Sequence, residues 1–306
     1  MRLGLVVFDA DEAVREARLA EQLGFDYVAA GEHVFFHGSV LNPFVALAAA
    51  AGATERIRLL SAISLLPLYA PALAAKLVTT LDRVSGGRLE LGVGAGGEYP
   101  PEFEACGVPL ESRFRRLDEC LRIFARFAAG MPVVDDGEYG RLDGLTLDPP
   151  PLQQPWPPIW VGGREAGARR RAARFADVWM PYMVTPEAFS RGLAEVRAAA
   201  AGHGRNPVGG AIFTTVCVDA DGDWARSTGI AFVSGLYRQD FSALADRYLA
   251  VGTPAQVAAR LREYADAGAE TAVVAIAAPA AQRERVIRTF ASDVAPELGP
   301  YPPHLT

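Results

Sequence analysis

The chain has 306 residues, half of them hydrophobic, with 36 acidic side chains against 30 basic ones and a formal net charge of -6. This length suits one large α/β barrel or two ordinary domains. The acidic balance argues against a general nucleic-acid binder, because such proteins need a basic surface to neutralise phosphates.

Cysteine and hydropathy patterns narrow the class further. The three cysteines lie far apart and form no Cys-x-x-Cys pair, so we expect neither a disulfide framework nor a zinc knuckle. The chain enters an apolar strand at once, without the features of a signal peptide. Its longest apolar stretches contain prolines and are too short to span a membrane. We therefore expect a cytoplasmic protein with no membrane partner.

Strands and helices alternate through the first half of the chain. Residues 3–8 form a continuous apolar run, which is typical of a strand buried on both faces of a parallel sheet. Residues 11–23 place apolar side chains on one helical face, and Gly24 follows as a C-terminal cap. The alternation continues with predicted strands at 25–30, 57–63 and 88–91 and predicted helices at 42–52, 70–84 and 113–129.

Two interruptions, Gly130–Pro158 and Asp219–Val251, break the alternation in the second half, and we interpret them as insertions. Eight strands alternating with helices predict a (β/α)8 TIM barrel, with insertions after the fourth strand and its helix and after the seventh strand. No composition break marks a boundary, so residues 1–306 are expected to form one domain. The later strands are predicted at 159–161, 178–180, 211–218 and 271–274, with helices at 165–175, 186–201, 253–267 and near the C-terminus.

Residues 92–97, after the fourth predicted strand, match the Gly-x-Gly-x-x-Gly dinucleotide fingerprint. That fingerprint belongs in the first strand-to-helix turn of a Rossmann fold, whereas three strand-helix units precede this run. Pro100 and Pro101, which follow it, make a poor helix opening. A Rossmann dehydrogenase is therefore the weakest hypothesis, and we expect the glycines to let a planar or anionic ligand lie against the backbone.

In a barrel of this kind the ligand site lies where the carboxyl ends of the strands meet their loops. The second strand ends at Glu32 and His33, and an imidazole can donate or accept a proton near neutral pH. Glu32 is expected either to orient His33 or to face solvent. His37 lies four residues further on, but no third ligand accompanies the two histidines, so we predict no metal site.

The fifth strand ends at Gly162, Gly163 and Arg164, directly before a predicted helix. Free amides and the helix dipole at such a place favour a phosphate, and Arg164 adds positive charge. The alternative is a tight turn that needs glycine for backbone reasons alone. The helix that follows carries arginines at positions 169, 170, 171 and 174, which we expect to form a solvated face that draws an acidic ligand toward the site.

Motifs spread over nearly the whole chain resemble those of the bacterial luciferase-like family of flavin- and deazaflavin-dependent oxidoreductases. Their order and spacing carry the resemblance, which implies a (β/α)8 barrel. The motifs lie at residues 20–27 with 32–33, 80–94, 157–163 with 176–177, and 252–254.

The resemblance also implies site residues. Members that use coenzyme F420 have Asp-His at the end of the second strand, where the histidine assists proton movement; His33 matches it, and Glu32 replaces the aspartate. The family has a non-prolyl cis peptide behind the cofactor ring, which falls within one position of Ala62-Ile63. In the same way, residues expected to flank the cofactor are Ala95, Gly96, Gly97 and Glu98, and residues expected to receive its phosphate are Gly162, Gly163 and Arg164.

These observations favour an oxidoreductase that uses F420 and moves hydride to or from a small organic substrate, with both insertions shaping the substrate pocket. The main alternative is an FMN-dependent monooxygenase supplied with reduced flavin by a partner reductase. A non-catalytic flavin-binding relative is a third hypothesis. The alanine-rich helix at 42–52 and the habit of the family suggest a homodimer.

Overall fold

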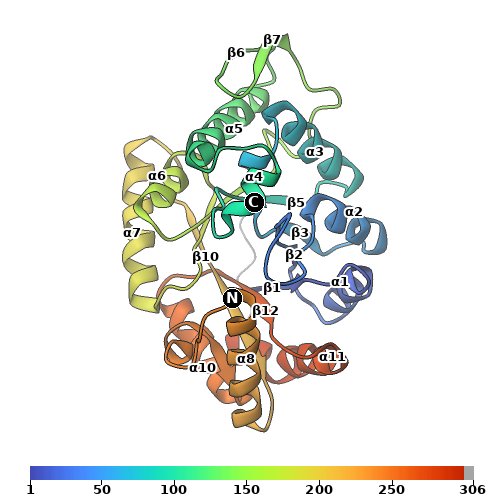
Figure 1. Cartoon of the computed structure of the whole chain (residues 1–306), viewed down its shortest axis with the longest axis vertical. Coiled ribbons are helices and arrows are strands. Elements are labelled where there is room, and N and C mark those ends of the chain that lie inside the picture. Colours follow the sequence, from blue (N-terminus) through green and yellow to red (C-terminus); the bar gives the residue numbers. More distant parts are fainter. Residues whose placement is uncertain (300–306) are drawn as a thin grey trace.

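The computed structural model describes residues 1–299, in which eight parallel strands close into a barrel (Figure 1). Each strand pairs with the next around the ring, and β10 closes it by pairing with both β9 and β12. The predicted (β/α)8 barrel is therefore confirmed. In order around the barrel the strands are β1 (Arg2–Val7), β2 (Tyr27–Ala30), β3 (Arg58–Ser61), β5 (Leu89–Gly94), β8 (Ile159–Gly162), β9 (Val178–Met180), β10 (Gly209–Val218) and β12 (Thr271–Ile276).

Helices cover the outside of the barrel, and a separate apolar cluster that includes Tyr27, Leu60 and Trp160 fills its interior. Because the strands bury side chains on both faces, they read as continuous apolar runs. No helix within residues 1–299 is long and apolar enough to cross a membrane. The covering helices are α1 (Ala13–Gln22), α2 (Pro43–Ala53), α3 (Pro71–Val84), α5 (Arg113–Ala128), α6 (Ala166–Phe175), α7 (Pro186–Gly202), α10 (Pro254–Asp266) and α11 (Ala280–Thr289).

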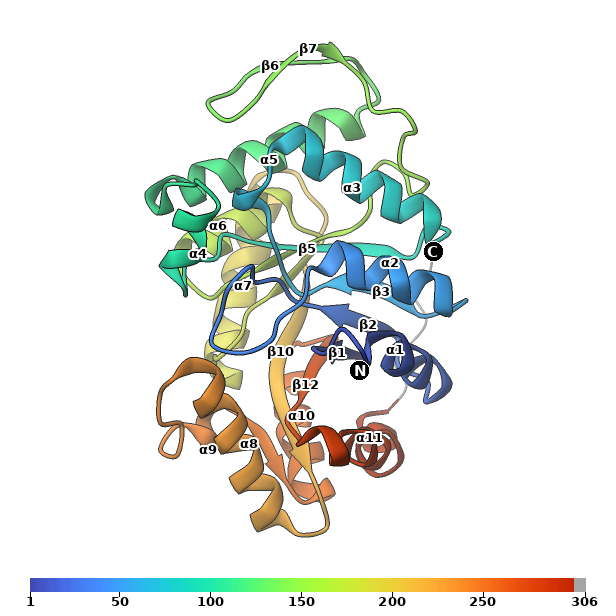
Figure 2. The ribbon, with the colours of Figure 1, turned by 45° about the vertical axis from the view of Figure 1, so that its right-hand side comes forward.

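The two insertions lie in different parts of the molecule. The first contains a hairpin, β6 with β7, that projects beyond α3 and α5 (Figure 2). The second forms α8 and α9, which have an apolar cluster of their own around Val233 and Phe241. The elements of the insertions are β6 (Val133–Asp136), β7 (Arg141–Leu145), α8 (Gly222–Tyr237), α9 (Ala245–Tyr248) and β11 (Ala250–Gly252).

A short helix, α4 (Pro100–Ala105), begins at the two prolines after the glycine run. Proline is tolerated in the first turn of a helix, where its missing N–H has no partner inside the helix in any case. The prediction that Pro100 and Pro101 make a poor helix opening is therefore wrong. This turn carries Glu102 and Phe103 into the interior, where both are fully buried.

Candidate active site

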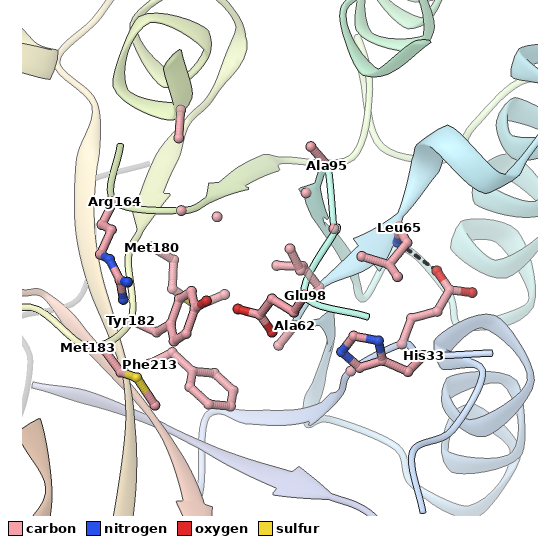
Figure 3. Close-up of a pocket in the computed structure, with 18 of the residues that line it drawn as sticks. His33, Ala62, Leu65, Ala95, Glu98, Arg164, Met180, Tyr182, Met183 and Phe213 are labelled. Atoms are coloured by element: carbon pink, nitrogen blue, oxygen red, sulfur yellow. Dashed lines mark hydrogen bonds between the residues drawn. The ribbon is translucent and has the colours of Figure 1, made fainter. Parts of the chain in front are cut away.

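A cavity of about 770 Å³ opens at the carboxyl ends of the barrel strands (Figure 3). Its volume falls within the range of about 300–1,000 Å³ that is usual for ligand and cofactor sites. The ends of β2, β3, β5 and β8 meet there, although they are far apart in the sequence. The structure places all the site residues predicted from the sequence on its wall, namely Glu32, His33, Ala62, Ile63, Ala95, Gly96, Gly97, Glu98, Gly162, Gly163 and Arg164.

His33 follows β2, and its ring is held by Glu102 from α4. The Nδ1 atom of His33 lies 3.1 Å from Oε1 and 3.2 Å from Oε2 of Glu102. Because a carboxylate has only acceptor positions, Nδ1 donates, and the Nε2 atom of the neutral imidazole is left as the acceptor. Phe36 stacks on the ring with 4.1 Å between centroids. The contacts with Glu102 and Phe36 define both the tautomer and the orientation of His33.

Sequence reasoning missed Glu102, although it makes the most direct contact with His33. The side chain is fully buried, and its Oε2 also accepts from the backbone N–H of Val34 at 3.1 Å. The signal that could have found it is the proline pair: read as the first turn of a helix, it places Glu102 in that turn.

Glu32 precedes His33 in the sequence but has different partners. Its Oε2 accepts from the backbone N–H of Leu65 at 2.6 Å, the bond dashed in Figure 3, and its Oε1 accepts from Asn42 at 2.9 Å and from the hydroxyl of Tyr69. Burial raises the pKa of Glu32, and the hydrogen bonds from Tyr69 and Leu65 oppose that rise. Among the described residues, Glu32 neither hydrogen-bonds to His33 nor faces solvent, contrary to both expectations, because the orienting carboxylate comes from α4.

The peptide bond between Ala62 and Ile63 is cis, as predicted, and the Ile63 side chain lies among glycines. A Cβ on Gly94 would overlap the Cδ1 of Ile63, and a Cβ on Gly162 would lie 3.1 Å from the same atom. A Cβ on Gly92 would overlap the carbonyl oxygen at the end of β3. The expectation that the whole glycine run serves a ligand is therefore corrected at Gly92, which makes room for the chain itself, whereas Gly94 makes room for Ile63 and also lines the cavity.

Residues 95–98 continue the wall of the cavity after Gly94. Gly96 and Gly97 have φ angles of +63° and +108°, which favour glycine. A Cβ on Gly97 would lie 2.8 Å from the Nε of Arg113. The loop then directs the Glu98 side chain into the cavity (Figure 3).

The Glu98 carboxyl is accessible to solvent from the cavity, yet the surrounding protein raises its pKa. Desolvation is the main cause and the charge of Glu102 adds to it, whereas His33 and Arg164 oppose it. The pKa of the Tyr237 hydroxyl is also raised, first by burial and then by the charge of Glu98. Glu98 therefore holds its proton more readily than a surface glutamate does.

The turn between β8 and α6 concentrates positive charge at one end of the cavity. Gly163 has a φ angle of +103°, and Arg164 lies over the ring of Tyr182 with 5.4 Å from its Cζ to the ring centroid. Guanidinium nitrogens of Arg170 and Arg171 lie 3.8 Å from the place of a Cβ on residue 167, in the first turn of α6. Because a helix N-terminus favours anions, this end suits a phosphate.

The arginines of α6 do not form one solvated face, as the sequence had suggested. The side chain of Arg171 is only 12% exposed, and its Nε lies 2.5 Å from Asp118. Arg169 lies 2.8 Å from Glu195, while Arg170 lines the cavity. Two of these side chains are therefore engaged by carboxylates of neighbouring helices.

The remaining wall of the cavity is largely apolar and comes in part from the second insertion. Of residues 130–158, all within the described part of the chain, none lines the cavity, so the prediction that the first insertion shapes the pocket is wrong. That hairpin instead projects from the opposite side of α5. The second insertion contributes Phe232, Leu236, Tyr237, Tyr248 and Leu249.

Comparison with known proteins agrees with this architecture. A protein of Mycobacterium bovis, described as uncharacterised, is 35% identical over 174 residues, which are 56% of this chain and 59% of that protein. The chain therefore matches less than two thirds of that relative's length. Among solved structures, the monooxygenase RslO1 from Streptomyces bottropensis is 27% identical with a TM-score of 0.85, and the match covers 97% of this chain and 99% of that one.

Two more distant structures show the same fold. The coenzyme F420 dependent tetrahydromethanopterin reductase from Methanopyrus kandleri is 20% identical with a TM-score of 0.82, covering 97% of this chain and 99% of that one. The oxygenating constituent of 3,6-diketocamphane monooxygenase from Pseudomonas putida, solved with FMN, is 21% identical with a TM-score of 0.73, covering 97% and 98%. The structural neighbours thus include F420- and FMN-dependent enzymes. Because the family model described as luciferase-like monooxygenase matches residues 2–271, nearly the whole chain, this protein belongs to that family.

Proposed function

We propose that this protein is a coenzyme F420-dependent oxidoreductase that transfers hydride between the deazaflavin and a small organic substrate. The observation that carries the proposal is the pairing of His33 with the buried Glu102 at the wall of the cavity. When hydride reaches or leaves a carbonyl or alcohol carbon, a proton must be added to or removed from its oxygen. An imidazole with an oriented, free Nε2 can move that proton.

The residues of the cavity fit a flavin-like cofactor. Ala62 and Ile63 with the loop at 95–97 offer a surface of small and apolar groups against which a planar ring can lie. Arg164 and Arg170 at the N-terminal end of α6 would hold its phosphate. When bound, the deazaflavin supplies or accepts the hydride.

The chain's own residues then have separate tasks. Glu102 keeps the Nδ1 proton of His33 in place, so that Nε2 alone exchanges a proton with the substrate oxygen. Glu32 braces the backbone after the cis bond through Leu65, which makes its part in the reaction a positioning one. Tyr237 of α8 packs edge-on against Phe36, which stacks on His33, so this helix helps to hold the imidazole in place.

An FMN-dependent monooxygenase that takes reduced flavin from a partner reductase is a second candidate. It is favoured by the likeness to the monooxygenase RslO1. We place F420 first because His33, oriented at the wall of the cavity by Glu102, can move the proton that accompanies hydride transfer to or from a carbonyl or alcohol carbon. A non-catalytic relative is the least favoured, since the imidazole of His33, oriented by Glu102, lines the cavity.

We also propose that two copies of the chain associate through α2. The outward face of this helix carries apolar and small residues, with Val45 being 71% exposed, and the neighbouring α3 exposes Leu73 and Val84. Burial of such a surface against a second copy would remove it from water.

Parallel fluorescence titrations with F420 and FMN test the choice of cofactor. Micromolar binding of F420, with reduction or oxidation of a bound organic compound, is the expected result. Micromolar binding of FMN without a response to F420 would overturn the first proposal in favour of the second. In His33→Ala we expect turnover to fall about 100-fold or more, as for loss of a general acid or base, while cofactor affinity changes little.

A further inference from the structure

The charged side chains that line the cavity fall into two sets. One set lies at the β8–α6 turn, the end of the cavity that suits a phosphate. The other lies at the ends of β2 and β5. The first set consists of Arg164, Glu165, Arg170 and Arg171, and the second of Glu32, His33 and Glu98.

A third part of the cavity wall carries no charged side chain among the described residues. Among the described residues that line the cavity, those from β10, β12, α8 and α9 are all uncharged. Phe8 and Phe232 pack with 5.8 Å between ring centroids, and Tyr237 meets Phe36 edge-on at 6.0 Å. We refer to this part, together with Phe8, Met183 and Leu249, which pack beside α8, as the apolar compartment. Its main members are Phe8, Met183, Phe213, Phe232, Tyr237 and Leu249.

Glu98 stands where the apolar compartment meets the rest of the cavity. Its side chain projects from the loop after β5 into the open space, with Tyr182 and Phe213 on the other side of that space (Figure 3). A ligand carboxylate or phosphate in the compartment would lose water without gaining a cation from its walls. It would also be repelled by Glu98 whenever that carboxyl is ionised.

A hydroxyl or carbonyl group has neither problem. It can exchange hydrogen bonds with the Nε2 of His33 and with the Glu98 carboxyl, because the two can act as acceptor or donor according to protonation. The rest of the ligand then lies against aromatic and aliphatic side chains, which favour rings. A cationic ligand is disfavoured by the same low polarity of the walls, and Arg164 adds positive charge nearby.

We propose that the apolar compartment binds an uncharged, ring-sized compound with one hydroxyl or carbonyl group directed at His33 and Glu98, and that Glu98 discriminates against carboxylated or phosphorylated analogues. The assignment of this compound as the substrate rests on the proposed function; its binding does not.

Three probes with one ring system test this. They are 2-naphthol, 6-hydroxy-2-naphthoate and 6-(aminomethyl)-2-naphthol, which are uncharged, anionic and cationic near neutral pH. Each probe is titrated by calorimetry into the protein alone and into the protein saturated with whichever cofactor binds. Because cofactor binding is measured independently, a failure of the proposed function can be told apart from a failure of the proposed binding in the apolar compartment. We expect the uncharged probe to bind at least about tenfold more tightly than either charged one. Equal or tighter binding of a charged probe, or no binding of 2-naphthol, overturns the inference.

Two substitutions and one matched control locate the residues responsible for this preference. In Glu98→Gln the preference for 2-naphthol over the naphthoate should narrow by about tenfold, because one nearby negative charge is removed. The matched change Glu104→Gln, on the exposed side of α4, should leave the preference unaltered. Leu236→Trp, which enlarges a half-buried side chain of the α8 wall, should weaken binding of 2-naphthol. An unchanged preference in Glu98→Gln, or unchanged 2-naphthol affinity in Leu236→Trp, overturns the assignment.

Discussion

Replacing Glu102 with glutamine changes one oxygen of a buried carboxylate into an amide nitrogen at almost constant size. In the native protein Oε1 accepts from His33 Nδ1 at 3.1 Å, and Oε2 accepts from the N–H of Val34 at 3.1 Å. If the single amide oxygen keeps the N–H of Val34, the amide NH2 faces Nδ1 and donates to it. The imidazole then carries its proton on Nε2, and the acceptor directed to the cavity is lost.

We expect kcat of Glu102→Gln to fall about 100- to 10,000-fold. The lower figure is the usual effect of losing a general acid or base, and the upper one is the effect of the analogous carboxylate-to-amide change in the serine protease triad. The charge-assisted hydrogen bonds to a buried group are also weakened, which should lower the free energy of unfolding by about 1–3 kcal/mol. Cofactor affinity should change little, because Glu102 does not line the cavity.

Steady-state kinetics at saturating cofactor, together with urea unfolding, measure these effects. Glu104→Gln is the matched control, because it makes the same change on an exposed position of the same helix. The reasoning is refuted if Glu102→Gln keeps more than about a tenth of the native kcat, since a reversed tautomer must cost more than that. It is also refuted if cofactor affinity falls by the same factor as kcat in Glu102→Gln.

Three further predictions concern pH, packing and assembly. Because the surrounding protein desolvates the Glu98 carboxyl and raises its pKa, this carboxyl stabilises the fold while protonated, and the contribution is lost as the pH rises from the ordinary carboxyl range through the raised value. The urea midpoint of the native protein should therefore fall relative to that of Glu98→Gln over that pH window. A difference between the two midpoints that does not change with pH would contradict the raised pKa of Glu98. Gly94→Ala should destabilise the protein by about 1–3 kcal/mol through overlap with the cis-bonded isoleucine. Gly235→Ala, at an open position of α8, should instead stabilise the protein by about 0.5–1 kcal/mol. Equal urea midpoints for the two variants would show that the contact with Ile63 does not require glycine at position 94. Val45→Lys should convert a dimer to a monomer in light scattering, whereas Val134→Lys on the hairpin should not, and a persistent dimer in Val45→Lys would exclude α2 as the interface.

Local patterns in the sequence predicted most of the architecture. Strands buried on both faces appear as apolar runs, and helix ends carry their own signals, such as the capping box of Thr253 and Gln256 that the structure contains. These features depend on neighbours along the chain, so they can be read without knowing the fold. The end of β2 at His33 and the turn before α6 were found in the same way, because a barrel gathers its strand ends at one mouth.

The errors share one cause. Two prolines were taken as a helix break, although their effect depends on whether they fall in the first turn or later. Gly92 and Gly94 were assigned to a ligand, whereas the carbonyl oxygen of Ser61 and the side chain of Ile63 occupy the space that a Cβ would need at these two positions. Nothing local distinguishes the insertion that lines the cavity from the one that projects away from it.

The sequence by itself thus determined the barrel and the strand-end histidine, because periodicity and caps are properties of short segments, and the resemblance of its motifs to the luciferase-like family implied the position of the cis bond. Only the tertiary structure decided that the carboxylate beside His33 belongs to Glu102 rather than to Glu32. The two residues of that pair are 69 positions apart, and they meet only because the closed barrel brings the ends of β2 and β5 to the same mouth.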